Sequence, residues 1–185
     1  MGWLVFAVGL IPGVYLWITA LEGGFANPVE ALIRGHGDWA LRFLWLTLTV
    51  TPAALLFGWY RLYLVRRALG LLSFTYAAVH VGIYAVLDRE LIAAEIWDDV
   101  VKRPFITIGL LTFLLLLPLA ATSFAAAQRT LGRRWKQLHK LIYPAAVLAV
   151  THYYMMVKAD TLEPLIYAGI LAVLFAVRIG RVRSA

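Results

Sequence analysis

The chain has 185 residues, of which 63% are hydrophobic and only 15% charged, and its mean hydropathy is +0.82. A soluble globular domain would need more polar surface, so this composition excludes one. The chain contains no cysteine, which excludes disulfides, thiolate-ligated haem, iron–sulfur clusters and thiol catalysis. The net charge of +7 does not indicate nucleic-acid binding, because the location of charge matters more than its sum in a membrane protein.

Six apolar blocks follow one another along the chain, and each is close to the ~20 residues that cross a bilayer as a helix. They are too long for outer-membrane barrel strands, which alternate over ~10 residues. The sequence therefore predicts an all-α fold, a bundle of six transmembrane helices forming one domain over residues 1–185. The blocks run from about Trp3 to Leu21, Ala40 to Tyr60, Leu64 to Leu87, Phe105 to Ala127, Leu138 to Val157, and Pro164 to Gly180.

The charged residues divide unequally between the two sides of such a bundle. The side with the N-terminus receives basic residues and no acid: Arg61, Arg66, Arg67, Arg129, Arg133, Arg134, Lys136, Lys140, Arg178, Arg181 and Arg183. The other side receives six basic residues and all ten acids: Arg34, Arg42, Arg89, Lys102, Arg103, Lys158, Glu22, Glu30, Asp38, Asp88, Glu90, Glu95, Asp98, Asp99, Asp160 and Glu163. By the positive-inside rule, both termini are predicted to be cytoplasmic.

Histidines in the third and fifth blocks are the main candidates for chemistry. A histidine inside an apolar span is costly and therefore suggests a functional site. His80 and His152 both lie toward the outer ends of their blocks, and odd-numbered spans run parallel, so the two imidazoles are expected at one depth. Two imidazoles facing each other at one depth in a helix bundle favour a bis-histidine haem b site, which suits electron transfer.

The inner ends of the same blocks carry Arg66, Arg67 and His139. Arginine has no lone pair for iron, so a haem there would have His139 as its evident ligand, with Arg66 or Arg67 pairing with the haem propionates. On one ideal helix, His139 and His152 would point about 140° apart. Either a distortion near Pro144 or a helix that begins after His139 would reconcile them. His36 falls in an outer loop, where we expect a surface role.

Several motifs in a fixed order resemble one known family. They are RRALGLLSFTYAAVH, KRPFITIG, PLAATS, LGRRWKQLHKLIYPA, THYYMMVKAD and EPLIYAG. Together they resemble the haem-binding membrane subunits of bacterial protein-methionine-sulfoxide reductase systems, the MsrQ family, within the ferric-reductase-like transmembrane superfamily. The resemblance covers nearly the whole chain.

This resemblance implies haem binding at His80, His139 and His152, while Arg66 stands where the wider superfamily has a fourth histidine. It also implies a place in the bacterial inner membrane. There the subunit would pass electrons across the lipid bilayer to a periplasmic molybdopterin-containing methionine-sulfoxide reductase, the chain that would carry out the sulfoxide chemistry. The implied electron source is the quinone pool or a cytosolic flavin reductase. The family is also described as binding FMN, but no residue here indicates a flavin site.

Three other functions compete with electron transfer. Intramembrane histidines serve proton-coupled transporters, but no carboxylate lies within a predicted span and no inverted repeat is evident. A metal-ion carrier would need several ligands at one depth, where only one histidine pair is expected. A plain membrane anchor for another subunit would need no histidine at depth.

Overall fold

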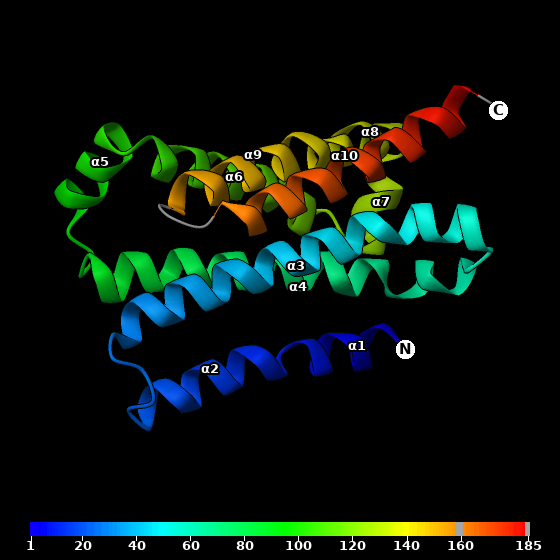
Figure 1. The fold of residues 1–185 in the computed structure, drawn as a ribbon. Helices are drawn as coiled ribbons and strands as arrows, with labels where there is room; N and C mark the ends of the chain where they lie inside the picture. The colour runs from blue at the N-terminus through cyan, green and yellow to red at the C-terminus, as the bar shows by residue number, and fades with distance from the viewer. Residues whose placement is uncertain (158–160, 184–185) are drawn as a thin grey trace. The chain divides into compact units, whose positions relative to one another are not determined.

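The computed structural model describes residues 1–157 and 161–183, with side chains up to Arg178. Every regular element in these ranges is a helix and none is a strand, which confirms the all-α prediction (Figure 1). Lys158 and Asp160, which the charge argument assigns to the outer side, lie outside the described residues. So do the side chains of Arg181 and Arg183.

The chain folds into two compact units, and the long helix α3 contributes to both. Unit 1 comprises Met1–Thr47 and Leu64–Lys102; unit 2 comprises Leu48–Tyr63 and Arg103–Ala185. The elements up to the end of unit 1 are α1 Gly2–Gly9, α2 Ile11–Leu21, α3 Pro28–Phe57, the short η1 Tyr60–Leu62, α4 Tyr63–Ile83, the π-helical turn η2 Tyr84–Asp88 and α5 Ala93–Lys102. The remaining elements are α6 Pro104–Ala121, α7 Ala125–Leu131, α8 Arg133–Leu138, η3 His139–Leu141, α9 Ile142–Met156 and α10 Leu162–Arg183.

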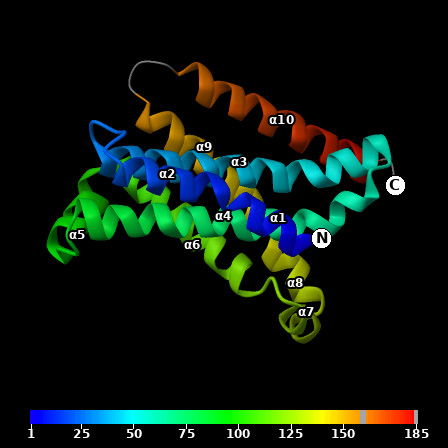
Figure 2. The ribbon, with the colours of Figure 1, turned by 90° about the horizontal axis from the view of Figure 1, so that it is seen from below.

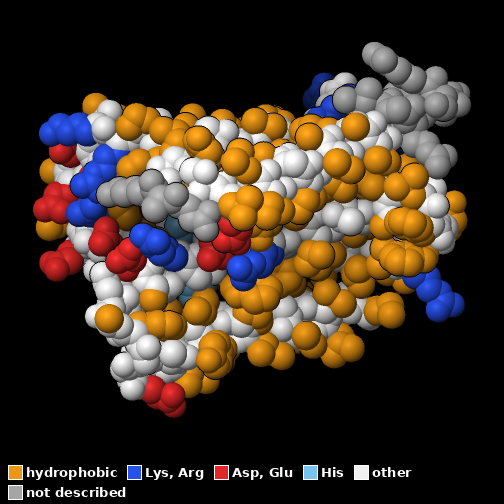
Figure 3. All heavy atoms as spheres, in the orientation of Figure 1, with side chains coloured by type: hydrophobic (Ala, Val, Ile, Leu, Met, Phe, Trp, Pro, Cys, Tyr) orange, Lys and Arg blue, Asp and Glu red, His pale blue; other side chains and the backbone are white. Residues whose placement is uncertain are grey.

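Four helical segments among the described residues are long and apolar enough to cross a membrane. They are Gly2–Leu21, Pro28–Phe57, Tyr60–Asp88 and Pro104–Ala121, and each overlaps one of the first four predicted blocks. Apolar side chains are spread over the face seen in Figure 3, and charged side chains gather mainly at its left end, as expected for a surface in contact with lipid. The chain is therefore a helical membrane protein.

The second predicted block began at Ala40, and this boundary was wrong. Helix α3 begins at Pro28 because the preceding residue caps it. The Glu30 backbone N–H donates to Asn27 Oδ1 at 3.2 Å, and Asn27 Nδ2 donates back to Glu30 Oε2 at 3.2 Å. Asparagine at the cap, proline at the first helical position and glutamate at the third are together a helix-start signal. The segment that resembled an outer loop is therefore helix.

The structure also decides how the fifth block accommodates its two histidines. Helix α9 begins at Ile142, whereas His139 lies in the preceding 3₁₀ turn η3. Of the two expected solutions, the helix that begins after His139 is the one found. The fourth block likewise ends earlier than predicted, because α6 stops at Ala121 and α7 is a separate helix.

In unit 1, a tyrosine of α4 joins the two halves of the first span. The backbone N–H of Gly13 donates to Tyr76 Oη at 2.8 Å, and Tyr76 Oη donates to the Gly9 carbonyl at 2.8 Å. Gly9 and Gly13 are one turn apart, so the hydroxyl replaces the bond that a continuous helix would make. This bridge fixes α1 and α2 alongside α4, as Figures 1 and 2 show. The core around it contains Phe43, Leu72, Phe6, Leu10, Trp39, Ala40 and Leu69.

Replacing Tyr76 by phenylalanine is expected to lower the free energy of unfolding by about 1–3 kcal/mol, because a buried N–H and a buried carbonyl lose their partner. Tyr15→Phe is the matched control, since the Tyr15 side chain is 66% exposed on α2. Denaturant unfolding in detergent micelles, followed by circular dichroism, would measure both. Equal stability of the two variants would contradict the bridging role.

In unit 2, α9 packs between α6 and α10, and an arginine ties α10 to α3. Arg178 Nη2 donates to the Leu48 carbonyl at 2.9 Å, and its Nη1 donates to Tyr143 Oη at 2.6 Å. The Leu48 carbonyl would ordinarily accept from the N–H four residues later, but that residue is Pro52, which has none. Arg178 therefore supplies the donor that the proline removes.

A double-mutant cycle tests this substitution of donors. Arg178→Met alone is expected to cost about 1–3 kcal/mol of unfolding free energy, because it leaves a buried carbonyl without a donor. In a Pro52→Ala background the residue-52 N–H becomes available, so the same change should cost less. Unfolding in detergent measures all four proteins. An unchanged cost in the two backgrounds would show that the Leu48 carbonyl does not depend on Arg178.

Candidate functional site

His152 on α9 is held against α6 by a hydrogen bond and a close glycine contact. Its Nδ1 lies 2.7 Å from the Phe105 carbonyl oxygen. One turn further along α6 is Gly109, where an added Cβ would lie only 2.8 Å from His152 Cε1 and 2.9 Å from its Nδ1. No real Cβ approaches that closely, so the imidazole occupies the space that the missing side chain leaves.

His80 on α4 is held against α3 in the same way. Its Nδ1 lies 2.8 Å from the Ile33 carbonyl oxygen, and a Cβ on Gly37 would lie 3.1 Å from that nitrogen. In both units the histidine follows the carbonyl residue by 47 positions, and the glycine stands one turn after the carbonyl. Two helix pairs thus build the same arrangement from sequences that share no obvious repeat.

These contacts fix which ring nitrogen carries the proton. A carbonyl oxygen can only accept, so Nδ1 of His80 and of His152 must donate. In the neutral imidazole, Nε2 is then the nitrogen that carries a lone pair. A metal-bound histidine usually donates its other ring N–H to a carbonyl or carboxylate in this way. Both side chains therefore have the tautomer and the outer contact that are usual for a metal-bound histidine.

His139 lies in η3, at the end of unit 2 where the basic helix α8 meets α9. Its Nδ1 is 3.2 Å from the Trp135 carbonyl oxygen, and its ring stacks on the Trp135 indole with centroids 3.8 Å apart. The indole Nε1 in turn donates to the Thr122 carbonyl at 2.9 Å. The His139 ring is thus oriented by a tryptophan that is itself anchored to the end of α6.

The expected surface role of His36 was wrong. His36 lies within α3 with only 3% of its surface exposed, and its Nδ1 is 2.8 Å from the Leu32 carbonyl oxygen of its own helix. Its ring packs near Trp17 and Tyr76. The neighbouring Gly35 is small for packing, because a Cβ there would lie 2.7 Å from a Leu16 methyl carbon. His36 is a packed core residue of unit 1.

The predicted arginines lie on the same helix as His80. Arg66 is partly buried and Arg67 is exposed, both in the first turn and a half of α4. The helix runs without interruption from Tyr63 to Ile83, so the fourteen-residue spacing from Arg66 to His80 places both near one face of α4. The structure thus places His80 with these arginines in unit 1, and His139 with His152 in unit 2.

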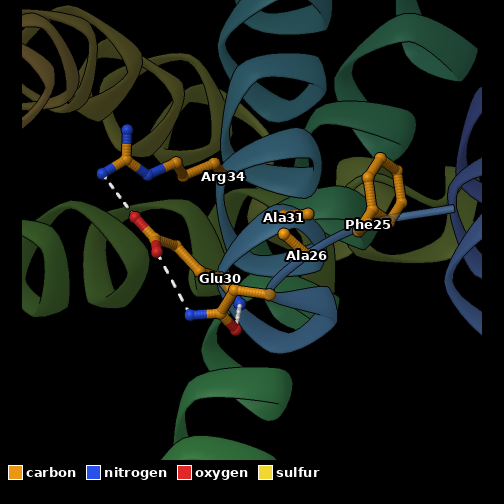
Figure 4. A pocket seen from close by; sticks show the side chains of 6 residues that line it. Phe25, Ala26, Glu30, Ala31 and Arg34 are labelled. Carbon is orange, nitrogen blue, oxygen red and sulfur yellow. Dashed lines mark hydrogen bonds and ion pairs between the residues drawn. The ribbon is translucent and has the colours of Figure 1, made fainter. Parts of the chain in front are cut away.

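A surface hollow at the start of α3 is not a competing site. It is lined by Phe25, Ala26, Asn27, Glu30, Ala31 and Arg34 (Figure 4). Its charged side chains bind one another, since Arg34 Nη2 lies 2.6 Å from Glu30 Oε1. Both side chains are more than half exposed, and such surface ion pairs contribute little to the stability of a protein.

Comparison with known proteins places the chain in a family. A family model described as "Ferric reductase like transmembrane component" matches residues 36–150. The chain belongs to the ferric reductase-like transmembrane family. The matched segment includes His80 and His139, together with both glycines that contact the histidine rings, and ends just before His152.

Three curated relatives are similar over nearly the whole chain, and all carry the name protein-methionine-sulfoxide reductase heme-binding subunit MsrQ. The protein of Rhodospirillum rubrum is 49% identical over 95% of this chain and 85% of its own length. That of Brucella anthropi is 48% identical over 97% of this chain and 81% of its own. That of Azospira oryzae is 46% identical over 95% and 76%, respectively. The resemblance identified from the motifs is therefore confirmed.

Sequence reasoning missed the residues that hold the histidines. Gly109 lies within the motif KRPFITIG and Gly37 directly follows His36, but neither was assigned a role. A glycine has no side chain whose chemistry could attract notice. The available signal was the equal separation between each glycine and its histidine, at two places in one chain.

Proposed function

We propose that this protein is a haem b membrane subunit that carries electrons across the bacterial inner membrane to a periplasmic methionine-sulfoxide reductase. The names of the relatives support haem binding and membership of that reductase system. The observation that carries the proposal for this chain is the pair of identical contacts, Nδ1 of His80 to Ile33 and Nδ1 of His152 to Phe105.

In this proposal His80 and His152 would together hold one haem, through Nε2 of each ring. The predicted topology supports a shared iron, because the third and fifth spans run parallel and both histidines lie toward their outer ends. A haem iron with two imidazole ligands exchanges single electrons without opening a coordination position. The surrounding residues hold each histidine ring in one tautomer and one orientation. This would limit the movement of the rings when the iron is reduced.

A second haem near the cytoplasmic side is the proposed role of His139. Its stacked and anchored ring is suited to a ligand. Arg66 or Arg67 would pair with propionates, as a planar guanidinium suits a carboxylate. Because arginine cannot bind iron, this site would differ from the outer one. FMN binding rests on the family resemblance alone, and no residue is assigned to it.

The remaining features of the proposal concern topology and partners. The six-span bundle needs α9, with 15 residues, and α10 as its last two spans, with both termini in the cytoplasm and the whole chain as one domain. The molybdopterin-containing partner would receive electrons on the periplasmic side. The quinone pool or a cytosolic flavin reductase would supply them on the other. The basic side chains of α8, exposed at Arg133, Arg134 and Lys136, would face that donor.

The transporter and metal-carrier alternatives find no support. No group of three or more histidine, aspartate or glutamate side chains that could hold a metal ion occurs in the part of the chain that the structure describes. The comparisons also give no transporter among the relatives quoted.

The visible spectrum of the purified protein separates these functions. After reduction with dithionite, a haem b subunit is expected to show sharp absorption bands, whereas a transporter or anchor would be colourless. The same preparation, reconstituted in vesicles with the reductase outside, should support methionine-sulfoxide reduction by an electron donor enclosed within. A colourless protein would contradict the proposal.

A further inference from the structure

Helix α5 is a short amphipathic helix between two membrane spans. The segment Tyr60–Asp88 ends just before it and the segment Pro104–Ala121 begins just after it. α5 itself covers only Ala93–Lys102. With so few residues between the spans, α5 cannot move far from the membrane surface. Charged and apolar side chains both gather where α5 lies in Figure 3.

A buried ion pair clamps one side of α5 to the end of the preceding span. Asp99 is 7% exposed; its Oδ2 lies 2.7 Å from Arg89 Nε in an ion pair and accepts a hydrogen bond from Tyr84 Oη at 2.8 Å. The Arg89 guanidinium also lies over the Tyr84 ring, 5.7 Å from its centre. Because Tyr84 belongs to the π-helical turn that ends α4, these contacts fix the rotation of α5 about its own axis.

The turn that leads into α5 is held in an unusual backbone conformation. Glu90 and Leu91 have φ values of +50° and +59°, which residues other than glycine rarely adopt. Two backbone hydrogen bonds of 2.8 Å, from Leu91 N–H to Ala85 and from Ile92 N–H to Arg89, maintain it. The result is that Leu91 is 65% exposed and Ile92 44% exposed.

The side of α5 opposite the clamp carries an exposed apolar stripe. Trp97 is 69% exposed and Val101, one turn later, is 65% exposed. Leu91 and Ile92, in the turn between η2 and α5, are exposed apolar residues as well. Beside this stripe, Asp98 and Lys102 form an ion pair, with Oδ1 and Nζ 2.7 Å apart. Apolar and charged side chains are thus sorted onto two exposed faces of one short helix.

We propose that α5 lies in the membrane interface, with Trp97, Val101, Leu91 and Ile92 inserted at the boundary between lipid headgroups and acyl chains. Amphipathic helices with an aromatic residue on the apolar face adopt this position, and tryptophan prefers this depth. The preceding span also ends in exposed apolar residues, since Val86 is 49% and Leu87 43% exposed. A protein partner is a less suitable occupant, because the helix is joined on both sides to spans that keep it at the lipid surface.

Because the clamp fixes the rotation of α5, it also determines which side chains of α5 face the water. With Trp97 directed into lipid, the exposed Glu95 on the other side of α5 faces the aqueous side, and the paired Asp98 and Lys102 lie at the edge between the two faces. This orientation follows from the contacts within unit 1 and does not depend on haem. The position of α5 can therefore be disproved while the proposed electron transfer stands. Equally, electron transfer can be disproved while the position of α5 stands.

The absence of cysteine allows one label to be placed at a time. Trp97→Cys and Val101→Cys, with Glu95→Cys as the control on the polar face, would each carry a nitroxide in lipid nanodiscs. At positions 97 and 101 we expect collisions with oxygen to exceed those with a water-soluble nickel complex several-fold more than at position 95. Equal ratios at the three positions would overturn the proposal, and so would labels at 97 and 101 shielded from both collision partners.

A second measurement needs no cysteine and guards against local unfolding in the labelled variants. Brominated lipids quench tryptophans at the interface, so Trp97→Phe should remove a quenchable fraction of the fluorescence. Trp45→Phe is the control, because Trp45 is 5% exposed within α3. If Trp97→Phe and Trp45→Phe lower the quenchable fraction equally, Trp97 is not in contact with lipid.

Discussion

Alanine at either His80 or His152 is expected to abolish the outer haem. Each substitution removes one of the two proposed axial nitrogens, and the remaining imidazole cannot hold a six-coordinate iron alone. Haem content per chain, measured as the pyridine complex of the extracted haem, should fall by the same amount in the two single variants. The double variant should lose no more than either, because both residues would serve one cofactor.

His36→Ala is the control for these variants. His36 is a buried histidine of unit 1, hydrogen-bonded within its own helix, so its loss should perturb packing without removing a ligand. We expect a milder decrease in haem content than for His80→Ala. Equal haem loss in the two variants would mean that the ligand assignment is wrong. Circular dichroism of each variant would establish that the helices remain folded.

Alanine at Gly109 is expected to lower haem affinity about as much as losing the hydrogen bond that orients His152 would. The new Cβ would lie 2.8 Å from His152 Cε1, so the ring must shift away from the Phe105 carbonyl. Loss of such an outer contact typically costs roughly 10–100-fold in metal affinity. Haem titration of the apoprotein would measure the affinity, and the reduction potential should change with it because the orienting hydrogen bond is lost.

The two units offer a graded comparison and two controls for this experiment. Gly37→Ala should have the smaller effect, because its Cβ would lie 3.1 Å from His80 Nδ1, where a slight shift of the ring suffices. Gly169→Ala in α10 and Gly82→Ala in α4 have open space around the new methyl group and should leave haem affinity unchanged. A larger effect at Gly37 than at Gly109, or any effect at the control glycines, would contradict the packing argument.

The membrane helices were predictable where apolar runs have clear ends. The block Leu64 to Leu87 corresponds to α4 with its π-helical turn, Tyr63–Asp88, and the block that began at Phe105 corresponds to α6. The start of α3 was missed because Arg34, Asp38 and two glycines interrupt hydrophobicity there. Hydropathy detects burial in lipid, whereas α3 begins with a polar capped turn. The cap formed by Asn27 and Glu30 is a local signal that hydropathy does not register.

The histidines were predictable as candidates, but their surroundings were not. An imidazole in an apolar span is costly enough to be noticed. The partner that orients it is a backbone carbonyl on another helix, and every residue has a carbonyl, so composition cannot single out Ile33 or Phe105. The same reasoning applies to Tyr76, whose hydroxyl closes the gap between α1 and α2. Contacts made to the backbone become visible only when the helices are placed in space.

The most direct test of the central claim is the low-temperature electron paramagnetic resonance spectrum of the oxidised protein, recorded for the wild type and for His80→Ala and His152→Ala. If His80 and His152 ligate one iron, a single low-spin signal of a bis-imidazole haem should be present in the wild type and lost in both variants. If that signal persists in either variant, or if each variant loses a different signal, the two histidines do not share a haem.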